Sequence, residues 1–480
     1  MDTLLPAATI LYISIIFGLA LFAKKKVHTE TDFLAAGRKL STVFSSATLF
    51  ATWFGAGTLL TATDAIYNDG FKVTALEPFG AGACLIIAGL FFAKPLWKMN
   101  ILTIPDFFKL KFGKRAEIIS ALLMVPGYFG WIAVQIVALS GIINLFFGLP
   151  LWLSMIAITV IATVFTCLGG MWSVTLTDAA QMLLVGVAII ILGYVVLDAY
   201  GNGYWLTGLQ ELVLEKRFTA ELADLKSQSS KLFSYLNVFV IASLGNLPGQ
   251  DLAQRIFSAR CELTAKRSCL IAGFFYVTLG SISILLGLAA RKLLPMSVEH
   301  SVLPMLAKQL LTPGLTVLLL LAIISIVLST IDSAILATSS IIAHNLLKYR
   351  ALSKSYSLVS LCRLCTIFVG LSSLIIAFVG DDAYALLEAS YAISLVSLFV
   401  PFAMGLFGKY FNEQAALCSM LVGVAFWGIG SLININNSLE LMAVLLSFGT
   451  YVLVSTINAK KLSYYEQNSR HGELTLELFK

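Results

Sequence analysis

Long apolar runs alternate with short polar segments along almost the whole chain. Each run reaches about 20 residues, the length that an α-helix needs to cross the hydrocarbon core of a bilayer. The pattern predicts an all-α polytopic membrane protein with about thirteen transmembrane helices. We expect them at residues 4–23, 43–67, 73–96, 117–147, 152–171, 175–199, 232–257, 268–291, 313–345, 356–379, 383–407, 414–432 and 438–457.

The second of these runs has an unusual middle. Ser46 to Tyr67 is apolar enough to cross a membrane, but Gly55, Gly57 and small or hydroxyl residues occupy its centre. In a bilayer a broken helix is tolerated only where its freed carbonyl groups face protein or a water-lined cavity. The pattern therefore favours a break that could hold a cation. The alternative is that the two glycines only let neighbouring helices approach closely.

A second interruption, GNLPGQ at residues 245–250, lies in the seventh run. With the first run set aside, runs two to six and seven to eleven form two groups of five. Because five is odd, the groups start on opposite sides of the membrane, and each begins with an interrupted helix. Paired breaks in inverted halves are typical of secondary transporters. We expect a division into an N-terminal extra helix with a basic inner loop (1–42), a first repeat (43–199), an outer loop (200–231), an inverted second repeat (232–410), two peripheral helices (411–457) and a cytoplasmic tail (458–480).

Composition supports a membrane protein and gives its orientation. The chain has 480 residues, of which 59% are hydrophobic and 12% charged, with a mean hydropathy of +0.90. Soluble globular proteins do not reach this balance. The net charge of +6 does not indicate a nucleic-acid partner, because most Lys and Arg residues fall in alternate loops. The positive-inside rule then predicts a multi-pass protein of the plasma (inner) membrane, with its N-terminus outside and its C-terminus in the cytoplasm.

Cysteine and histidine show no pattern for metal binding or catalysis. The seven cysteines are scattered through apolar runs or beside basic loops, as is typical of small buried hydrophobic residues. The four histidines lie in loops or at helix ends without a catalytic partner pattern. The short polar tail leaves no room for a catalytic or signalling domain. We therefore expect no enzyme and infer no obligate protein partner.

Hydroxyl and carboxyl groups inside the predicted helices indicate an ion site. Ser325, Ser329, Asp332 and Ser333 recur at steps of three and four residues, so their oxygens line one helical stripe. Facing the carbonyls of the first break, this stripe would form an oxygen cage of low formal charge, which suits sodium better than divalent or transition metals. The alternatives are that the hydroxyls bond back to their own helix and that Asp332 pairs with a loop arginine. Asp178, in the sixth run, is the other carboxylate on the inner half and marks an ion path.

Aromatic and amide side chains indicate a solute site. Trp53 lies in the first break and Trp131 in the fourth run, so their rings could form faces for an organic ligand, including a cation. Gly57 belongs to the same break. Gln135 and Gln250 are mid-span polar groups that could orient a solute. For Glu77, near the outer mouth, a vestibule or structural role is as plausible as direct contact.

Five local motifs resemble the sodium:solute symporter family: TLFATWFGAGT, GLFFAKPLW, GGMWSVTLTDAAQ, GQDLAQRIFSA and LSTIDSAILATSS. Three stretches within them, ATWFGAG, GLFFAKP and LSTIDSAILATSS, are most similar to its high-affinity choline transporter branch. The resemblance runs through essentially the whole chain. It implies the LeuT-type fold of five plus five inverted helices, with one extra N-terminal helix and two C-terminal helices.

The resemblance also implies site residues. It assigns sodium to the carbonyls of Ala51, Phe54 and Ile326 and to the hydroxyls of Ser329 and Thr330. It makes Asp178 a residue of the sodium pathway or of a second ion, with Ser325 or Ser329 as possible neighbours. Trp53 and Trp131 match two aromatic positions around choline. The sequence departs at two other ring positions, which align with Ala81 and Gly249. Each lost contact of a cation with a ring would cost on the order of 0.5 to 2 kcal/mol.

We therefore predict a sodium-coupled secondary symporter that imports a small organic solute by alternating access, with Na+ as the coupling ion. The solute would be a quaternary ammonium or amino-acid-like compound. The alternatives are a membrane solute sensor that does not transport, or a symporter for a sugar or a carboxylate. A channel is disfavoured because the polar residues cluster at one midplane site and do not line a continuous pore.

Overall fold

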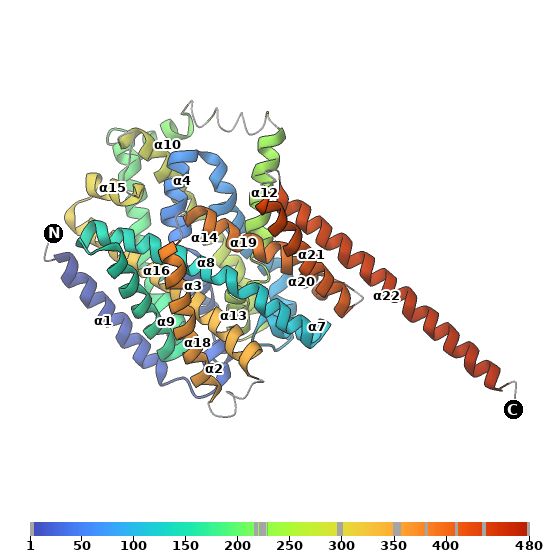
Figure 1. The fold of residues 1–480 in the computed structure, drawn as a ribbon. Helices are drawn as coiled ribbons and strands as arrows, with labels where there is room; N and C mark the ends of the chain where they lie inside the picture. Colours follow the sequence, from blue (N-terminus) through green and yellow to red (C-terminus); the bar gives the residue numbers. More distant parts are fainter. Residues whose placement is uncertain are drawn as a thin grey trace.

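In the computed structural model the chain forms a bundle of helices (Figure 1). The structure describes residues 4–215, 219, 227, 229–294, 301–348, 357–379, 383–408, 411–433 and 438–477. Part of the expected outer loop 200–231 and the last residues of the tail lie outside them. Within the described residues there is no strand, and an isolated bridge joins Leu40 to Ala259. The predicted all-α class is confirmed.

The bundle is built from helices of very different lengths. Its long helices are α1 (Leu4–Lys24), α8 (Lys114–Phe147), α9 (Leu151–Tyr200), α14 (Glu262–Leu293), α16 (Pro313–Ile341), α18 (Leu358–Val379), α21 (Glu413–Leu432) and α22 (Leu439–Glu477). Shorter ones are α2 (Glu30–Ala35), α3 (Thr42–Trp53), α4 (Ala62–Asp69), α5 (Ala81–Ile87), α6 (Ala93–Lys98), α7 (Ile104–Phe112), α10 (Trp205–Val213), α12 (Ser229–Gly245), α13 (Gln250–Ser258), α15 (Val302–Leu310), α19 (Ala383–Ser394) and α20 (Val400–Phe407). Single π-helical turns join several of them, including η2 (Gly57–Thr61), η6 (Ile342–Leu347) and η7 (Leu395–Phe399).

Ten described helical segments are long and apolar enough to cross a membrane, and two bent helix pairs bring the count to as many as twelve. The predicted count of thirteen would require α9 to make two crossings. Its 50 residues measure about 75 Å at 1.5 Å per residue, and the helix is interrupted at Gly170, where φ is 51° and ψ is −137°. The count and the predicted repeat boundaries remain predictions.

The two bent pairs lie where the sequence shows its two interruptions. α3 and the segment Gly57–Asp69 meet at 55°, and the segment Lys231–Gly245 meets α13 at 42°. In the first break, Phe54 leaves the helical region with ψ of 70°. In the second, Pro248 lacks a backbone N–H and disfavours helix at the preceding residue.

Packing places the two broken helices and α16 together at the centre of the bundle. α16 contacts α3, α8, α9 and α13, and α13 also contacts α3. α4, α10 and α15 lie at one end of the bundle and α2 lies at the other, while α22 extends away from it (Figure 1). The helices that meet at this centre, α3, α13 and α16, therefore come from parts of the chain that are far apart in sequence.

Candidate functional site

The first break frees backbone carbonyl groups. The N–H of Gly55 donates to the carbonyl of Trp53 at 2.9 Å, and the N–H of Ala56 donates to the Gln135 side-chain oxygen at 2.8 Å. In a continuous helix these two N–H groups would serve the carbonyls of Ala51 and Thr52. Gln135 therefore stabilises the break, and those two carbonyls are free to accept from other groups.

Hydroxyls of α16 lie against one of these carbonyls. Ser329 Oγ and Thr330 Oγ1 donate to the Ala51 carbonyl at 3.3 and 3.4 Å, and Thr330 also reaches the Ile326 carbonyl at 3.1 Å. All four residues are buried. Phe54, the residue that caps α3, lies three positions beyond Ala51. We call Ala51, Phe54, Ile326, Ser329 and Thr330 the oxygen cage.

Asp178 extends the oxygen cage toward α9. Its side chain is fully buried, and its carboxylate accepts hydrogen bonds from Thr48 and, at 2.5 Å, from Ser329. A carboxylate here adds formal negative charge beside neutral oxygen donors, a combination that suits a small monovalent cation better than a transition metal. No cluster of three His, Cys, Asp or Glu that could hold a metal ion occurs among the described residues.

The remaining polar groups of the α16 stripe have other partners. Ser325 accepts from the Tyr12 hydroxyl at 2.8 Å. Ser333 accepts from Thr52 at 3.0 Å and from Arg255 at 2.5 Å. Asp332 is buried and accepts from Thr166 at 3.5 Å. No ion pair joins Asp332 to an arginine within the described part of the chain.

A pocket with an empty volume of about 520 Å³ lies beside the break. Trp53 and Trp131, both predicted from the sequence, line it. Further aromatic and polar walls come from three helices and the second break: Tyr128 of α8, Asn246, Gly249 and Asp251 of the second break and α13, and Ser390, Tyr391 and Ser394 of α19. Sequence reasoning missed Tyr128, Asp251 and Tyr391. The signal for Asp251 was present, because it is a carboxylate inside a predicted span.

Asp251 is held by two aromatic side chains. Its Oδ2 accepts from the Trp53 indole N–H at 2.6 Å, and its Oδ1 accepts from the Tyr128 hydroxyl at 2.5 Å. The backbone N–H of Asp251 in turn donates to the same hydroxyl at 3.1 Å. The bond between Trp53 and Asp251 therefore joins the two broken helices directly.

Other predicted solute residues lie outside the pocket walls. Gln250 accepts from the N–H of Ile104 at 2.7 Å and donates to the carbonyl of Leu102 at 3.2 Å. Gly57 lies against Leu387, and Ala81 is not part of the lining. Gly249 does line the pocket. One of the two positions at which this sequence lacks the aromatic residue of the choline transporter branch therefore faces the pocket.

Glu77 is buried next to the pocket, and its carboxyl group accepts hydrogen bonds from three hydroxyl groups. It accepts from Thr58 at 3.0 Å, from Tyr276 at 2.5 Å and from Tyr391 at 3.3 Å. Tyr276 also donates to the carbonyl of Trp53 at 3.2 Å. Glu77 therefore supports both a pocket wall, through Tyr391, and the first break.

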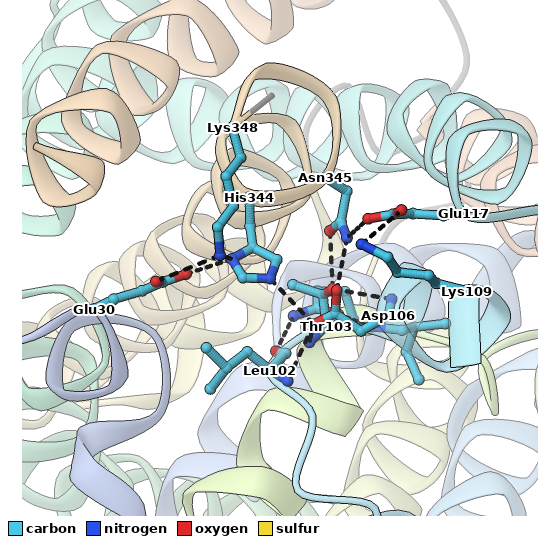
Figure 2. Close-up of polar contacts among 11 residues, drawn as sticks. Glu30, Leu102, Thr103, Asp106, Lys109, Glu117, His344, Asn345 and Lys348 are labelled. Atoms are coloured by element: carbon cyan, nitrogen blue, oxygen red, sulfur yellow. Dashed lines mark hydrogen bonds and ion pairs between the residues drawn. The ribbon is translucent and has the colours of Figure 1, made fainter. Parts of the chain in front are cut away.

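A network of charged and amide side chains joins α2, α7, α8 and η6 at the end of the bundle that holds α2 (Figure 2). His344 pairs with Glu30 and, at 3.2 Å, with Asp106. Asn345 donates to Asp106 and to Glu117, both at 3.0 Å, and accepts from Thr103 at 2.8 Å. We call this network the polar cluster; its members are Glu30, Thr103, Asp106, Lys109, Glu117, His344, Asn345 and Lys348.

Asp106 is the centre of the polar cluster and caps α7 together with Thr103. Burial acts to raise the pKa of the Asp106 carboxyl. The hydrogen bond and charge of His344, with hydrogen bonds from Asn345 and Leu102, outweigh burial and place that pKa below its ordinary value. Asp106 is therefore ionised at neutral pH. Because Gln250 holds Leu102 and Ile104, the polar cluster is connected to the second break.

A comparison with known protein families decides the identity of this arrangement. A model of the sodium:solute symporter family matches residues 33–423, most of the chain. The chain belongs to the sodium:solute symporter family. The resemblance seen in the sequence motifs is confirmed, and the protein is a sodium-coupled membrane symporter and not an enzyme.

Relatives of this symporter include two human transporters. The chain is 27% identical to the high affinity choline transporter 1 over 419 residues, which cover 82% of this chain and 69% of that one. It is 25% identical to the sodium-coupled monocarboxylate transporter 1 over 448 residues, 85% of this chain and 70% of that one. A solved structure of a Na+-coupled sialic acid symporter in a substrate-bound outward-open state aligns with a TM-score of 0.77 at 19% identity, covering 95% and 97% of the two chains. The predicted LeuT-type fold is confirmed.

Proposed function

We propose that this symporter binds sodium in the oxygen cage, with Asp178 as an additional ligand or as part of the ion's path, and a small organic solute in the adjoining pocket. The observation that carries the proposal is that the Ala51 carbonyl, freed by the first break, lies against the hydroxyls of Ser329 and Thr330. A sodium ion there would replace these weak hydrogen bonds and tie the break to α16.

Sodium and solute would be coupled through the backbone of the first break. Trp53 is two residues from Ala51 and lines the pocket, so an ion that orders the Ala51 carbonyl also orders the Trp53 ring. Ligands shift a conformational equilibrium by their differential affinity for its states. Bound sodium would thus favour the form in which the solute pocket is assembled, and release of both into a low-sodium interior would complete the import cycle.

We place the polar cluster on the cytoplasmic side, in agreement with the positive-inside rule and an outside N-terminus in the plasma (inner) membrane. There it would hold α7, α8 and η6 together while the pocket communicates with the outside. Its link to Gln250 would let a change at the second break loosen the cytoplasmic closure. This is the role we infer for Gln250, instead of direct solute contact.

The solute we propose is a compound with a positively charged nitrogen, either a quaternary ammonium or an amino-acid-like molecule. Support comes from the rings of Trp53 and Trp131 on the pocket, because aromatic faces attract organic cations. The similarity to choline transporters points the same way.

Uptake into proteoliposomes tests this function. With a sodium gradient directed inward, labelled choline or an amino-acid-like solute should accumulate, and replacing external sodium by potassium should abolish accumulation. Uptake that is indifferent to the sodium gradient would contradict the coupling. A solute that stabilises the protein without net uptake would indicate a sensor, and sodium-driven uptake of a sugar or carboxylate would contradict the proposed solute class.

Replacing Asp178 by asparagine is expected to weaken sodium binding on the order of 10-fold. The asparagine side chain has nearly the same shape as aspartate but lacks the charge that attracts the ion. The measurement is the sodium concentration that gives half of the full thermal stabilisation of the purified protein. Thr177→Ala is the matched control, since the Thr177 hydroxyl bonds to carbonyls of its own helix. An unchanged sodium titration for Asp178→Asn would remove this residue from the ion's site and path.

Asn345→Asp is expected to weaken the polar cluster, because the new carboxylate would face those of Asp106 and Glu117 where an amide now donates to both. We expect the melting temperature to fall by several degrees. The apparent sodium affinity in uptake should fall about fivefold, because the outward-facing form loses about 1 kcal/mol. Ser339→Ala, whose hydroxyl bonds to its own helix, is the control. Normal stability and normal sodium affinity in Asn345→Asp would contradict the closing role of the polar cluster.

A further inference from the structure

The pocket contains one formally charged side chain. Of the residues that line it, Asp251 alone is ionisable near neutral pH, and no Lys, Arg or His is among them. Asp251 is buried, with only 5% of its surface exposed. Burying a carboxylate is costly unless it is hydrogen-bonded and paired with positive charge. This wall of the pocket therefore attracts a positively charged group.

The two hydrogen bonds to Asp251 orient its carboxylate without neutralising it. The Trp53 indole and the Tyr128 hydroxyl each donate to a different carboxylate oxygen, at 2.6 and 2.5 Å. An ionised carboxylate has about four lone-pair sites and donates nothing. Two donors therefore leave accepting capacity on both oxygens, and the aromatic groups that hold them form walls of the same pocket.

Arg255 of the same helix does not pair with the Asp251 carboxylate. Arg255, buried one turn further along α13, donates to the backbone carbonyl of Asp251 at 3.3 Å and to Ser333 at 2.5 Å. It also interacts electrostatically with Asp178 as well as with Asp251. No ion pair joins its guanidinium to the Asp251 carboxylate among the described residues, so a cation bound in the pocket can pair with that carboxylate.

We propose that Asp251 is the specificity-determining counter-ion of the transported solute, and that the solute carries a protonated amine with at least one N–H that donates to this carboxylate. The inference rests on the proposed function and narrows its solute class. Sodium in the oxygen cage would lie beside Asp178, and the solute amine would pair with Asp251.

The hydrogen-bonding capacity of Asp251 separates amines from quaternary ammonium compounds. Both kinds of cation are attracted to the rings of Trp53, Tyr128, Trp131 and Tyr391. A quaternary ammonium has no donor, so it removes water from the carboxylate without replacing its hydrogen bonds. A protonated amine makes a charge-assisted hydrogen bond, which is among the stronger kinds in proteins. A neutral solute would displace water from the carboxylate without pairing with its charge, which is unfavourable. An anion would be repelled by it.

Three small probes of similar shape test the proposal on the full-length protein in sodium: N,N-dimethylethanolamine, which is a protonated tertiary amine at pH 7, choline, and the neutral isostere 3,3-dimethylbutan-1-ol. Larger primary amines, up to the size of arginine methyl ester, extend the panel. Affinity is measured by calorimetry and by thermal stabilisation. We expect the tertiary amine to bind about 5-fold or more tightly than choline, and the neutral isostere to bind more weakly than either on the order of 10-fold or more.

Asp251→Asn should lower amine affinity on the order of 10-fold and bring the affinities of the amine and of 3,3-dimethylbutan-1-ol to within about threefold of one another. Asp251→Glu should restore a preference for cations over the isostere. Ser340→Ala, whose hydroxyl bonds to the carbonyl of Ala337 in its own helix, is the control and should bind as the unmodified protein does. The comparison among probes in the unmodified protein does not depend on whether any variant folds.

Three outcomes would overturn the assignment: equal amine affinity in the unmodified protein and Asp251→Asn, a neutral or quaternary probe that binds as well as its amine counterpart, or no sodium-dependent stabilisation by any amine in the panel. Failure of the proposed function looks different. Amine uptake that does not depend on the sodium gradient would contradict sodium coupling but not the counter-ion role of Asp251. Sodium-driven uptake of a neutral solute would contradict the counter-ion role but not sodium coupling.

Discussion

Replacing Ser329 and Thr330 together by alanine is expected to abolish sodium-driven uptake. Both hydroxyls reach the Ala51 carbonyl, so the double variant removes two of the five oxygens of the oxygen cage and leaves the backbone of α16 intact. If each ligand contributes about 1.5 kcal/mol, the half-saturating sodium concentration should rise on the order of 100-fold. Sodium dependence of uptake in proteoliposomes is the measurement.

A second double variant on the same helix controls for that result. Thr338→Ala with Ser340→Ala also removes two buried hydroxyls, but these bond to the carbonyls of Ala334 and Ala337 in their own helix at 2.8 and 2.7 Å. It should transport with ordinary sodium dependence. If Ser329→Ala with Thr330→Ala transports equally well, sodium does not bind at the oxygen cage and the proposed mechanism fails with it.

Gly55→Ala is expected to reduce sodium-driven uptake more than 10-fold while the protein still folds. A Cβ at this position would lie 2.6 Å from Thr330 Oγ1 and 2.8 Å from Gln135 Oε1. Both side chains would have to shift, at a cost of about 1 to 3 kcal/mol. Thr330 would leave the Ala51 carbonyl, and Gln135 would lose the N–H of Ala56 that fixes the break. Sodium titration of uptake, with the melting temperature measured alongside, checks this.

Gly141→Ala is the matched control for Gly55→Ala. Gly141 is also a glycine of a membrane-spanning segment. It lies inside the continuous helix α8, and a Cβ added there meets no atom within 4 Å. It should leave uptake and melting temperature close to those of the unmodified protein. Equal behaviour of the two variants would mean that Gly55 is not required for close approach to the oxygen cage.

Much of the fold could be predicted because the chemistry of a bilayer is restrictive. Apolar runs of spanning length leave few choices besides helices. The first break lies where Gly55 and Gly57 interrupt such a run, and the second lies where residues 245–250 do so. The arrangement of Ser329 and Thr330 on one helical face was also accessible, because the helical period is fixed. The structure places both hydroxyls against the Ala51 carbonyl, and the assignment of sodium to these oxygens stays a prediction.

The walls of the pocket could not be predicted in the same way. Gln250 and Asp251 are neighbours at the start of α13, and a helix turns about 100° between adjacent residues. One side chain therefore reaches Leu102 and Ile104 while the next reaches Trp53 and Tyr128. No pattern in a sequence shows which of two adjacent polar residues faces a cavity when the helix begins at a break.

Long-range partners were inaccessible for a related reason. Tyr391 enters the pocket from α19, and nothing in the α19 sequence shows which distant helices its polar residues face. The polar cluster joins Glu30, Asp106 and His344, which come from three distant segments with no shared motif. In both cases the relevant spacing is set by helix packing and not by position in the chain.

The hydrogen bond between the Trp53 indole and the Asp251 carboxylate gives the transporter a built-in optical probe. An indole whose N–H is held by an anion in an apolar wall differs in emission from one that has exchanged that partner for water. The difference in fluorescence between the unmodified protein and Trp53→Phe should therefore follow the meeting and parting of the two broken helices in real time, without any attached dye.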